Sequence, residues 1–340
     1  MSKECVEQVE GAGASVPMTD ISNIDVPEGT DELSRNTRRA WRDRLNSAST
    51  RKMITGVLAT LVGGSFWGFS GTSASFLFDT YHVDTLWLMS VRQILAGLLF
   101  MAVVVTRDRE RLIKLWTTPA DRKQLLLFTA FGLLFNQFCY LSAVRLTNAG
   151  TATVLQCLQL VIIMGYTCVT DRRMPRTREV IGIGLALGGT FLIATGGDPT
   201  SLNISPLGLA AGLMCAVSAT CMAVIPAKIL PEYGSPIVTG SAMLTAGVVS
   251  CVFVQPWAHM PALDAAGAEA LAVFVVIGSF FAYMLYMQGV KDIGSVRASL
   301  IGTVEPVSAT ITSAVMLGTV FLPTDLIGFA MIIVMMFLTV

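Results

Sequence analysis

Residues 125–170 read LLLFTAFGLLFNQFCYLSAVRLTNAGTATVLQCLQLVIIMGYTCVT and indicate the class of fold. Arg145 is the one charged residue of this stretch, and Thr147-Asn148 is a short polar break between two apolar runs. The hydrocarbon core of a lipid bilayer is about 30 Å thick, which an α-helix crosses with about 20 residues. The stretch therefore predicts two membrane-spanning helices, at 125–146 and 149–170, that are joined by a very short turn.

The rest of the chain has the same apolar character. Of its 340 residues, 53% are hydrophobic and 14% are charged, whereas roughly a quarter of the residues of a soluble domain are charged. The mean hydropathy is +0.66, and these values argue against a water-soluble globular protein. The apolar runs predict an all-α integral membrane protein with ten transmembrane helices, at residues 54–77, 85–105, 125–146, 149–170, 179–196, 206–227, 236–257, 268–290, 295–317 and 325–340.

The two ends of the chain differ from the rest. Residues 1–52 are polar, first acidic and then basic, with the basic part running from Arg35 to Lys52. Because such a segment buries too little apolar surface to offset its loss of conformational entropy, we expect a disordered cytoplasmic N-terminal tail. The tenth apolar run has only 16 residues and ends at Val340, so a truncated last helix is also expected.

Basic residues are unevenly distributed among the predicted loops. Loop 107–124 holds six Lys and Arg residues and loop 171–178 holds four, in addition to those of the N-terminal tail. None is present in loops 78–84, 197–205, 258–267 and 318–324. Since Lys and Arg accumulate in cytoplasmic loops, we expect the chain in the plasma (cytoplasmic) membrane with both termini in the cytoplasm. Arg145, at the outer end of the third helix, is the exception.

The sequence contains a weak internal repeat. With an offset of 146 positions, residues 140–194 align without a gap with residues 286–340, and nine positions are identical. Gln159 then aligns with Glu305. Both halves hold five predicted helices, and an odd number places the second copy upside down in the membrane, as in many transporters. We therefore predict two inverted five-helix repeats, over residues 53–196 and 206–340.

Patterns that would indicate an enzyme or a metal site are missing from the sequence. The seven cysteines are scattered without metal-ligand spacing, and the two histidines, His82 and His259, fall in predicted loops away from any cysteine or carboxylate cluster. The sequence has no nucleotide-binding loop of the Walker type. We therefore expect no catalytic activity, no metal, no cofactor and no nucleic-acid partner.

Glu305 is the only acidic residue deep in a predicted span. An ionised side chain there costs at least ~2.5 to 3.5 kcal/mol, so it requires water, a partner or a proton. Pro306 lacks an N–H group and frees a carbonyl oxygen one turn earlier, and Ser308 extends the polar stripe. One interpretation is a site for a substrate ammonium group or for a proton. The other is a protonated glutamate that only hydrogen-bonds a neighbouring helix.

Gln159, at the equivalent position of the first half, shares a polar helix face with Gln156 and Thr153, because residues three positions apart lie on one side of a helix. A neutral amide opposite a carboxylate would suit a zwitterion or a polar organic solute. The alternative is that these amides only form hydrogen bonds between helices.

A further polar and aromatic set on the predicted helices consists of Trp67, Asn136, Gln137, Tyr140, Tyr283 and Tyr286. These residues would line a pathway, with Trp67 stacking on a cation or an aromatic ring, or would serve in packing. Arg92 lies near the outer end of the second helix. We interpret it as a structural or gating partner of Glu305, with binding of a substrate carboxylate and snorkelling to the headgroups as alternatives.

Four motifs resemble the EamA-like transporters of the drug/metabolite transporter superfamily: Gly64-Ser-Phe-Trp67-Gly68, Arg92 within the second helix, the hairpin from Tyr140 to Thr153, and Val304-Glu305-Pro306-Val307. Two features depart from the family pattern. Gln159-Leu160 stands where the first repeat often has a proline, and Asp171 and Thr319 stand where a glutamate commonly ends the helix. The resemblance implies a ten-helix carrier without a cofactor that exports amino acids or other small metabolites.

These observations predict a secondary transporter that moves a small-molecule substrate across the lipid bilayer by alternating access, with protons as the candidate coupling ion at Glu305. One alternative is a gradient-driven facilitator or exchanger. Another is a non-transporting membrane scaffold or sensor. An intramembrane enzyme is disfavoured, because one buried carboxylate without an intramembrane histidine provides no catalytic pair. The sequence predicts no particular oligomeric state.

Overall fold

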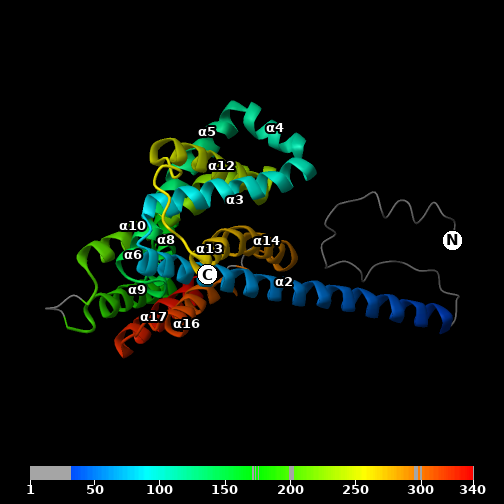
Figure 1. Cartoon of the computed structure of the whole chain (residues 1–340). Helices are drawn as coiled ribbons and strands as arrows, with labels where there is room; N and C mark the ends of the chain where they lie inside the picture. The colour runs from blue at the N-terminus through cyan, green and yellow to red at the C-terminus, as the bar shows by residue number, and fades with distance from the viewer. Residues whose placement is uncertain are drawn as a thin grey trace. The chain divides into compact units, whose positions relative to one another are not determined.

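The structure is a computed structural model that describes residues 32–170, 172, 174, 176–198, 203–294, 298 and 301–339. All regular elements in these residues are helices (Figure 1). Those of the first half are α2 (Glu32–Tyr81), α3 (Thr85–Arg107), α4 (Arg109–Thr117), α5 (Pro119–Leu127), η1 (Phe128–Leu134), α6 (Phe135–Leu146), α7 (Ala149–Gln156), α8 (Gln159–Thr170) and α9 (Thr177–Thr195). Those of the second half are α10 (Pro206–Val224), η2 (Ile225–Lys228), α11 (Ile229–Tyr233), α12 (Ser235–Val254), α13 (Ala265–Ala272), η3 (Val273–Phe281), α14 (Ala282–Ile293), α16 (Val304–Leu317) and α17 (Pro323–Thr339).

Eight helical segments of the described residues are long and apolar enough to cross a membrane. They are Thr50–Tyr81, Thr85–Arg107, Pro119–Leu146, Ala149–Thr170, Thr177–Thr195, Pro206–Ala227, Ser235–Val254 and Ala265–Ile293. Two shorter apolar helices follow, Val304–Leu317 and Pro323–Leu338. The predicted all-α fold is thereby confirmed, and each of the ten predicted runs overlaps one of these segments. Part of the run 295–317 lies outside the described residues.

Helix α2 begins at Glu32, inside the segment 1–52 for which the composition predicts disorder. Residues 32–52 of this segment are helical in the structure. These residues contain no glycine or proline and include several good helix formers. Because an existing helix grows without a new nucleation step, the membrane helix can extend into this polar segment. Residues 1–31 lie outside the described residues. The chain divides into two units after Arg51, and the features below belong to the unit that begins at Lys52.

The third and eighth spans share an irregularity. Helix α5 continues through the π-helical segment η1 into α6, and α13 continues through the π-helical segment η3 into α14. An offset of 146 positions places η1 inside the range of η3. A π-helical turn widens the helix and is frequent at functional sites. The offset found in the sequence from Tyr140 onward therefore applies to these earlier segments as well.

The fourth span is interrupted between α7 and α8, at Cys157-Leu158. In the second half, a turn at Thr303 precedes α16, which begins at Val304. Cys157 and Thr303 are again 146 positions apart. The two halves thus interrupt a helix at the same place of the repeat, next to Gln159 in one half and next to Glu305 in the other.

Helices α3 and α12 pack along each other in antiparallel order (Figure 1). A Cβ atom on Gly97 would lie 2.5 Å from the backbone nitrogen of Leu244, and one on Gly247 would lie 2.5 Å from the Cα atom of Ile94. Only glycine permits so close an approach. Since higher residue numbers on α3 face lower numbers on α12, the first residues of the two helices lie at opposite ends of the pair.

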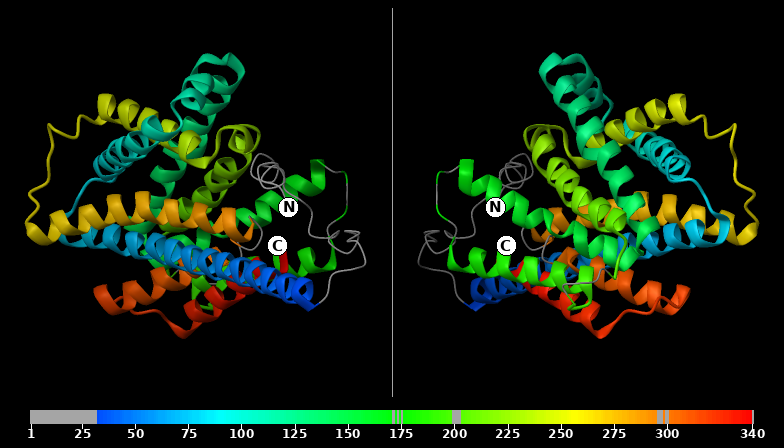
Figure 2. Two further views of the ribbon diagram at one scale, coloured as in Figure 1. Left: turned by 90° about the vertical axis from the view of Figure 1, so that its right-hand side faces the viewer. Right: turned by 90° about the vertical axis from the view of Figure 1, so that its left-hand side faces the viewer.

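Other helices also pack on partners from the opposite half. Helix α7 lies against α16, and α9 lies against α17. A Cβ atom on Gly189 of α9 or on Gly328 of α17 would lie 2.7 Å from the carbonyl oxygen of the other glycine. From Lys52 on, α2 runs beside α14 (Figure 2), where Gly63 faces the backbone nitrogen of Tyr286. The interior of the unit is thus an interface between its two halves.

The described residues form three hydrophobic clusters. The first cluster joins the end of α2 and the start of α3 to the hairpin between α6 and α7. The second joins the end of α3 to α4, α5, α11 and the start of α12. The third lies between α7, α9 and α17. Because α3 reaches from the first cluster to the second, these two lie at opposite ends of the α3–α12 pair.

Candidate functional site

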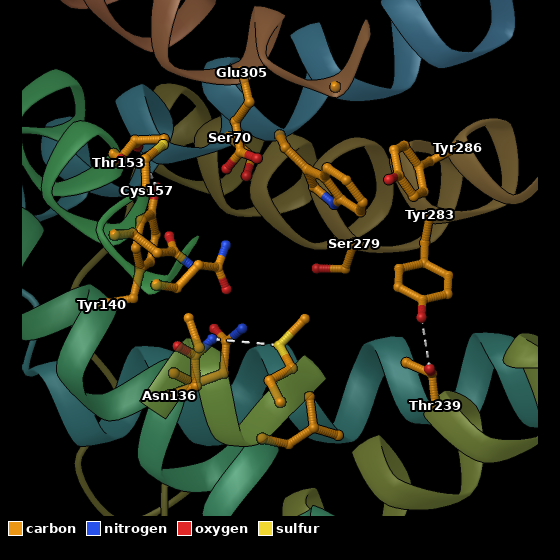
Figure 3. A pocket seen from close by; sticks show the side chains of 18 of the residues that line it. Ser70, Asn136, Tyr140, Thr153, Cys157, Thr239, Ser279, Tyr283, Tyr286 and Glu305 are labelled. Carbon is orange, nitrogen blue, oxygen red and sulfur yellow. Dashed lines mark hydrogen bonds between the residues drawn. The ribbon is translucent and has the colours of Figure 1, made fainter. Parts of the chain in front are cut away.

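A cavity of about 380 Å³ lies between the helices of the two halves (Figure 3). This volume is within the range of small-molecule sites, roughly 300 to 1,000 Å³. All of the predicted site residues line it except Ser308. The polar and aromatic lining consists of Trp67, Ser70, Arg92, Phe128, Asn136, Gln137, Tyr140, Thr153, Gln156, Gln159, Thr239, Ser279, Tyr283, Tyr286, Thr303 and Glu305.

Glu305 points into the cavity from the first turn of α16, with Ser70 beside it (Figure 3). The side chain is half-buried. Within the described residues, no donor forms a hydrogen bond with its carboxylate and no cation lies within ion-pair distance. The N-terminal end of a helix stabilises a nearby negative charge by about 0.3 to 1 kcal/mol. The carboxylate is therefore available to a proton or to a cationic group in the cavity.

Pro306 lines the cavity too, together with Gly302 and Thr303 one turn earlier. Helix α16 begins at Val304, so Pro306 lies in its first turn, where N–H groups have no helical partner in any case. Pro306 therefore helps to start α16 directly after the interruption at Thr303. Ser308 donates a hydrogen bond to the carbonyl oxygen of Ser65 at 2.9 Å. Ser308 thus joins α16 to α2 and is not part of the lining.

Gln156 and Gln159 flank the interruption of the fourth span and both line the cavity. The sequence predicts that they share one face of a continuous helix. The structure instead ends α7 at Gln156 and begins α8 at Gln159. The turn between them brings both amides to the cavity, where Gln159 is the counterpart of Glu305.

Trp67, Tyr283 and Tyr286 form an aromatic wall of the cavity. The ring centroid of Trp67 lies 5.0 Å from that of Tyr286 and 6.0 Å from that of Tyr283. The Tyr283 hydroxyl lies 2.8 Å from the hydroxyl groups of Ser235 and Thr239 on α12 (Figure 3). A tryptophan face of this kind attracts cations and stacks on planar rings.

Asn136 and Tyr140 lie on the other side of the cavity, and Asn136 is across from Glu305 (Figure 3). The Asn136 amide oxygen accepts a hydrogen bond from Ser218 at 3.0 Å. The hydroxyl groups of Tyr140 and Thr153 are 3.4 Å apart. Both side chains therefore face the cavity and also link neighbouring helices, so the two interpretations of this set do not exclude each other.

Arg92 is held inside the protein and does not snorkel to the headgroups. Its side chain is 6% exposed. Nε donates to the Ser279 hydroxyl at 2.8 Å, one Nη donates to the Gln137 amide oxygen at 3.1 Å, and the other donates to the carbonyl oxygen of Gly278 at 3.4 Å. No ion pair joins it to Glu305 in the described part of the chain. Arg92 thus fixes the π-helical segment η3 against α3 and α6.

Several lining residues carry no distinct signal in the sequence. Serine, threonine and methionine are common in apolar helices, and only the packing shows which of them reach the cavity. Methionine side chains are flexible and polarizable, so they adapt to ligands of different shape. The residues that sequence reasoning missed include Ser70, Phe128, Met222, Thr239, Met243, Ser279, Met287 and Met336.

Comparisons with known proteins add independent observations. The sequence model of the EamA-like transporter family matches residues 54–195 and 206–340. A Salmonella typhimurium protein named uncharacterized inner membrane transporter YicL is 30% identical over 84% of this chain and 94% of its own length. The uncharacterized transporter YwfM of Bacillus subtilis is 22% identical over 81% of this chain and 90% of its own length. One crystal structure has a TM-score of 0.54 at 18% identity, covering 85% of this chain and 95% of that one, and shares the fold.

Proposed function

Because the chain belongs to the EamA-like transporter family, we propose that it is a secondary transporter that carries amino acids or other small metabolites across the cytoplasmic membrane by alternating access. In this proposal the chain crosses the membrane ten times, in two inverted five-helix repeats, with α16 and α17 as the ninth and tenth spans. Both termini are placed in the cytoplasm, and the direction is export. Two relatives that match most of the chain are named as transporters, and the family match itself divides into two copies.

The packing of α3 against α12 supports the inverted arrangement. These are the second helices of the two copies, and their glycine contacts run in antiparallel order. Two copies with the same orientation in the membrane would instead place equivalent helices parallel. The equivalent π-helical segments and the equivalent interruptions agree with a repeat of this kind. In carriers of this architecture, the solute site lies between the copies and near interrupted helices.

The observation that carries the proposal is the unpaired carboxylate of Glu305 in a cavity to which both copies contribute. A carboxylate in such a cavity binds either a proton or a cationic group of the solute. Because the two compete for one site, a gradient of one changes the occupancy by the other, and this linkage is reciprocal. The site therefore suits a carrier that exchanges protons for a solute bearing an ammonium group.

Purified protein in proteoliposomes provides the test. A counterflow screen of labelled amino acids, nucleosides and organic cations first identifies a solute. Glu305→Gln then keeps the size of the side chain and removes its ionisable group. We expect this variant to lose the flux that a pH gradient drives while counterflow of the solute remains measurable. Glu269→Gln, on the exposed part of α13 and outside the lining, is the matched control and should keep both activities.

Two results would change the conclusion. Gradient-driven flux that is unchanged in Glu305→Gln rules out coupling at this residue and leaves a facilitator or exchanger. Absence of counterflow for every class of solute contradicts the proposed transport function and favours a scaffold or sensor. A scaffold or sensor would also tolerate substitution of Trp67 and Gln159.

A further inference from the structure

Two tyrosines each join the end of one helix to the beginning of another through an aspartate. Tyr81, the last residue of α2, donates a hydrogen bond to Asp264, the N-cap residue of α13. Tyr233, the last residue of α11, donates to Asp121, in the first turn of α5, at 2.6 Å. We name these pairs the outer latch, Tyr81–Asp264, and the inner latch, Tyr233–Asp121.

The two tyrosines lie at equal distances from the starts of the two family matches. They are 152 positions apart, as are residues 54 and 206, at which the two family matches begin. The residue after each tyrosine has a positive φ angle, 50° at His82 and 80° at Gly234. A positive φ is uncommon for a residue other than glycine. A positive φ therefore follows both tyrosines, although only one of the two positions holds a glycine.

The accepting aspartates differ by one helical turn. With the offset of 146, Asp264 corresponds to Thr118, the N-cap of α5, and Asp121 corresponds to Gly267 of α13. The ring of Tyr81 also lies against Gly267, where a Cβ atom would be 2.9 Å from Cζ of the tyrosine. Both tyrosines thus contact the first turn of equivalent helices, and each finds a carboxylate there.

The latches lie at opposite ends of the helix packing. Tyr81 comes just before α3 and Tyr233 just before α12, and the first residues of these antiparallel helices are far apart. Tyr81 packs on the first hydrophobic cluster and Tyr233 belongs to the second. An ion pair of 2.6 Å between Lys114 and Glu232 reinforces the inner end. The cavity lining, which includes Arg92 about two turns into α3, lies between the two ends.

We propose that the two tyrosine–aspartate latches are the gates of the transport cycle, and that they open in alternation. The proposal rests on the proposed function, which supplies alternating access and assigns the basic loop 107–124, and with it the inner latch, to the cytoplasm. Both latches are formed in this structure. One hydrogen bond contributes little net free energy, so its removal shifts the balance between closed and open ends by roughly 2- to 10-fold.

Cys157 reports the state of both gates, because this cysteine is 7% exposed and lines the cavity between them. The full chain is placed in vesicles of one orientation and treated with a membrane-impermeant thiol reagent, from the outside or from the inside. Mass spectrometry then measures modified Cys157. Tyr81→Phe should raise labelling from the outside roughly 2- to 10-fold and leave labelling from the inside unchanged, and Tyr233→Phe should do the reverse.

Further variants separate gating from general damage. Asp264→Ala and Asp121→Ala remove the acceptors and should reproduce the side-selective effects of the corresponding tyrosine variants. Tyr166→Phe, on a tyrosine of α8 that is 54% exposed, is the control and should change neither side. The proposal is overturned if labelling of Cys157 is unchanged in the latch variants. It is also overturned if labelling rises equally from both sides in the variants of both latches. Since labelling requires no transported solute, this result is independent of whether counterflow is found.

Discussion

Gln159 and Glu305 face one cavity from corresponding positions, and each follows an interruption of its helix. The two side chains are nearly equal in size and differ in charge. In a carrier with inverted copies, the copies exchange conformations as the site turns from one face of the membrane to the other. A single carboxylate therefore makes the two copies chemically unequal at the solute.

Exchanging the two side chains tests whether the positions are equivalent. Glu305→Gln alone should abolish proton-driven flux, because no other carboxylate lines the described part of the cavity. The double variant Gln159→Glu, Glu305→Gln returns one carboxylate to the same cavity and should recover part of this flux in proteoliposomes. A double variant that is no more active than Glu305→Gln would show that the carboxylate acts only from α16.

The positions of the helices and most of the polar and aromatic lining could be predicted from the sequence. The bilayer sets the length of an apolar run, so the ten runs appear without knowledge of packing. Polar residues inside such runs are few, because each is costly in lipid, and those that occur tend to face the interior. For this reason Asn136, Gln156 and Glu305 could be placed near a common cavity before their contacts were known.

Features that depend on contacts between distant segments could not be predicted. The turn at Cys157-Leu158 contains no glycine or proline, so no local residue marks it. Arg92 lies near a helix end, where arginine often snorkels, but its partners Gly278 and Ser279 come from a helix almost 190 residues away. The π-helical segments likewise lack a local sequence pattern.

Replacing Trp67 should weaken the binding of cationic or aromatic solutes. A cation over a tryptophan face gains about 0.5 to 2 kcal/mol, so Trp67→Leu should raise the concentration needed for half-maximal competition in counterflow by roughly 2- to 30-fold. Trp67→Phe should lose less, because an aromatic face remains. Trp257→Leu, at a site that is 66% exposed, is the control. If solutes reach half-maximal competition at the same concentration with Trp67→Leu as with the native protein, Trp67 serves in packing alone.

The outer latch should be insensitive to pH over the range of transport assays. The hydrogen bond from Tyr81 holds the pKa of Asp264 below its usual value of 3.8. A lowered carboxyl pKa means that the stabilisation is complete above the usual value and is lost only as the pH falls through the lowered one. The ratio of outside to inside labelling of Cys157, in which the ionisation of the thiol cancels, should therefore be the same at about pH 8 and about pH 5.5. A ratio that rises toward the lower pH would assign the outer gate to a different titrating group.

Adding one methyl group at the contact between α3 and α12 should destabilise the protein. The Cβ atom of Gly97→Ala would meet the backbone nitrogen of Leu244 at 2.5 Å, and backbone cannot move aside as a flexible side chain can. Overpacking of this kind costs about 1 to 3 kcal/mol, which a lowered midpoint of thermal unfolding in detergent would show. Gly247→Ala should have a similar effect, because its Cβ meets the backbone of Ile94 in the reciprocal contact.

Gly184→Ala on α9 is the matched control for this substitution, since no atom lies within 4 Å of the added Cβ. Alanine is favoured over glycine inside a helix by about 0.8 to 1 kcal/mol, so the control should unfold at the same or a higher temperature. If the alanine variants of Gly97, Gly247 and Gly184 all lower the midpoint of thermal unfolding equally, glycine acts through helix flexibility in general. Losses confined to Gly97 and Gly247 would instead show that the two copies meet at one close, antiparallel crossing, which is the contact that a rocking motion of one copy against the other must preserve.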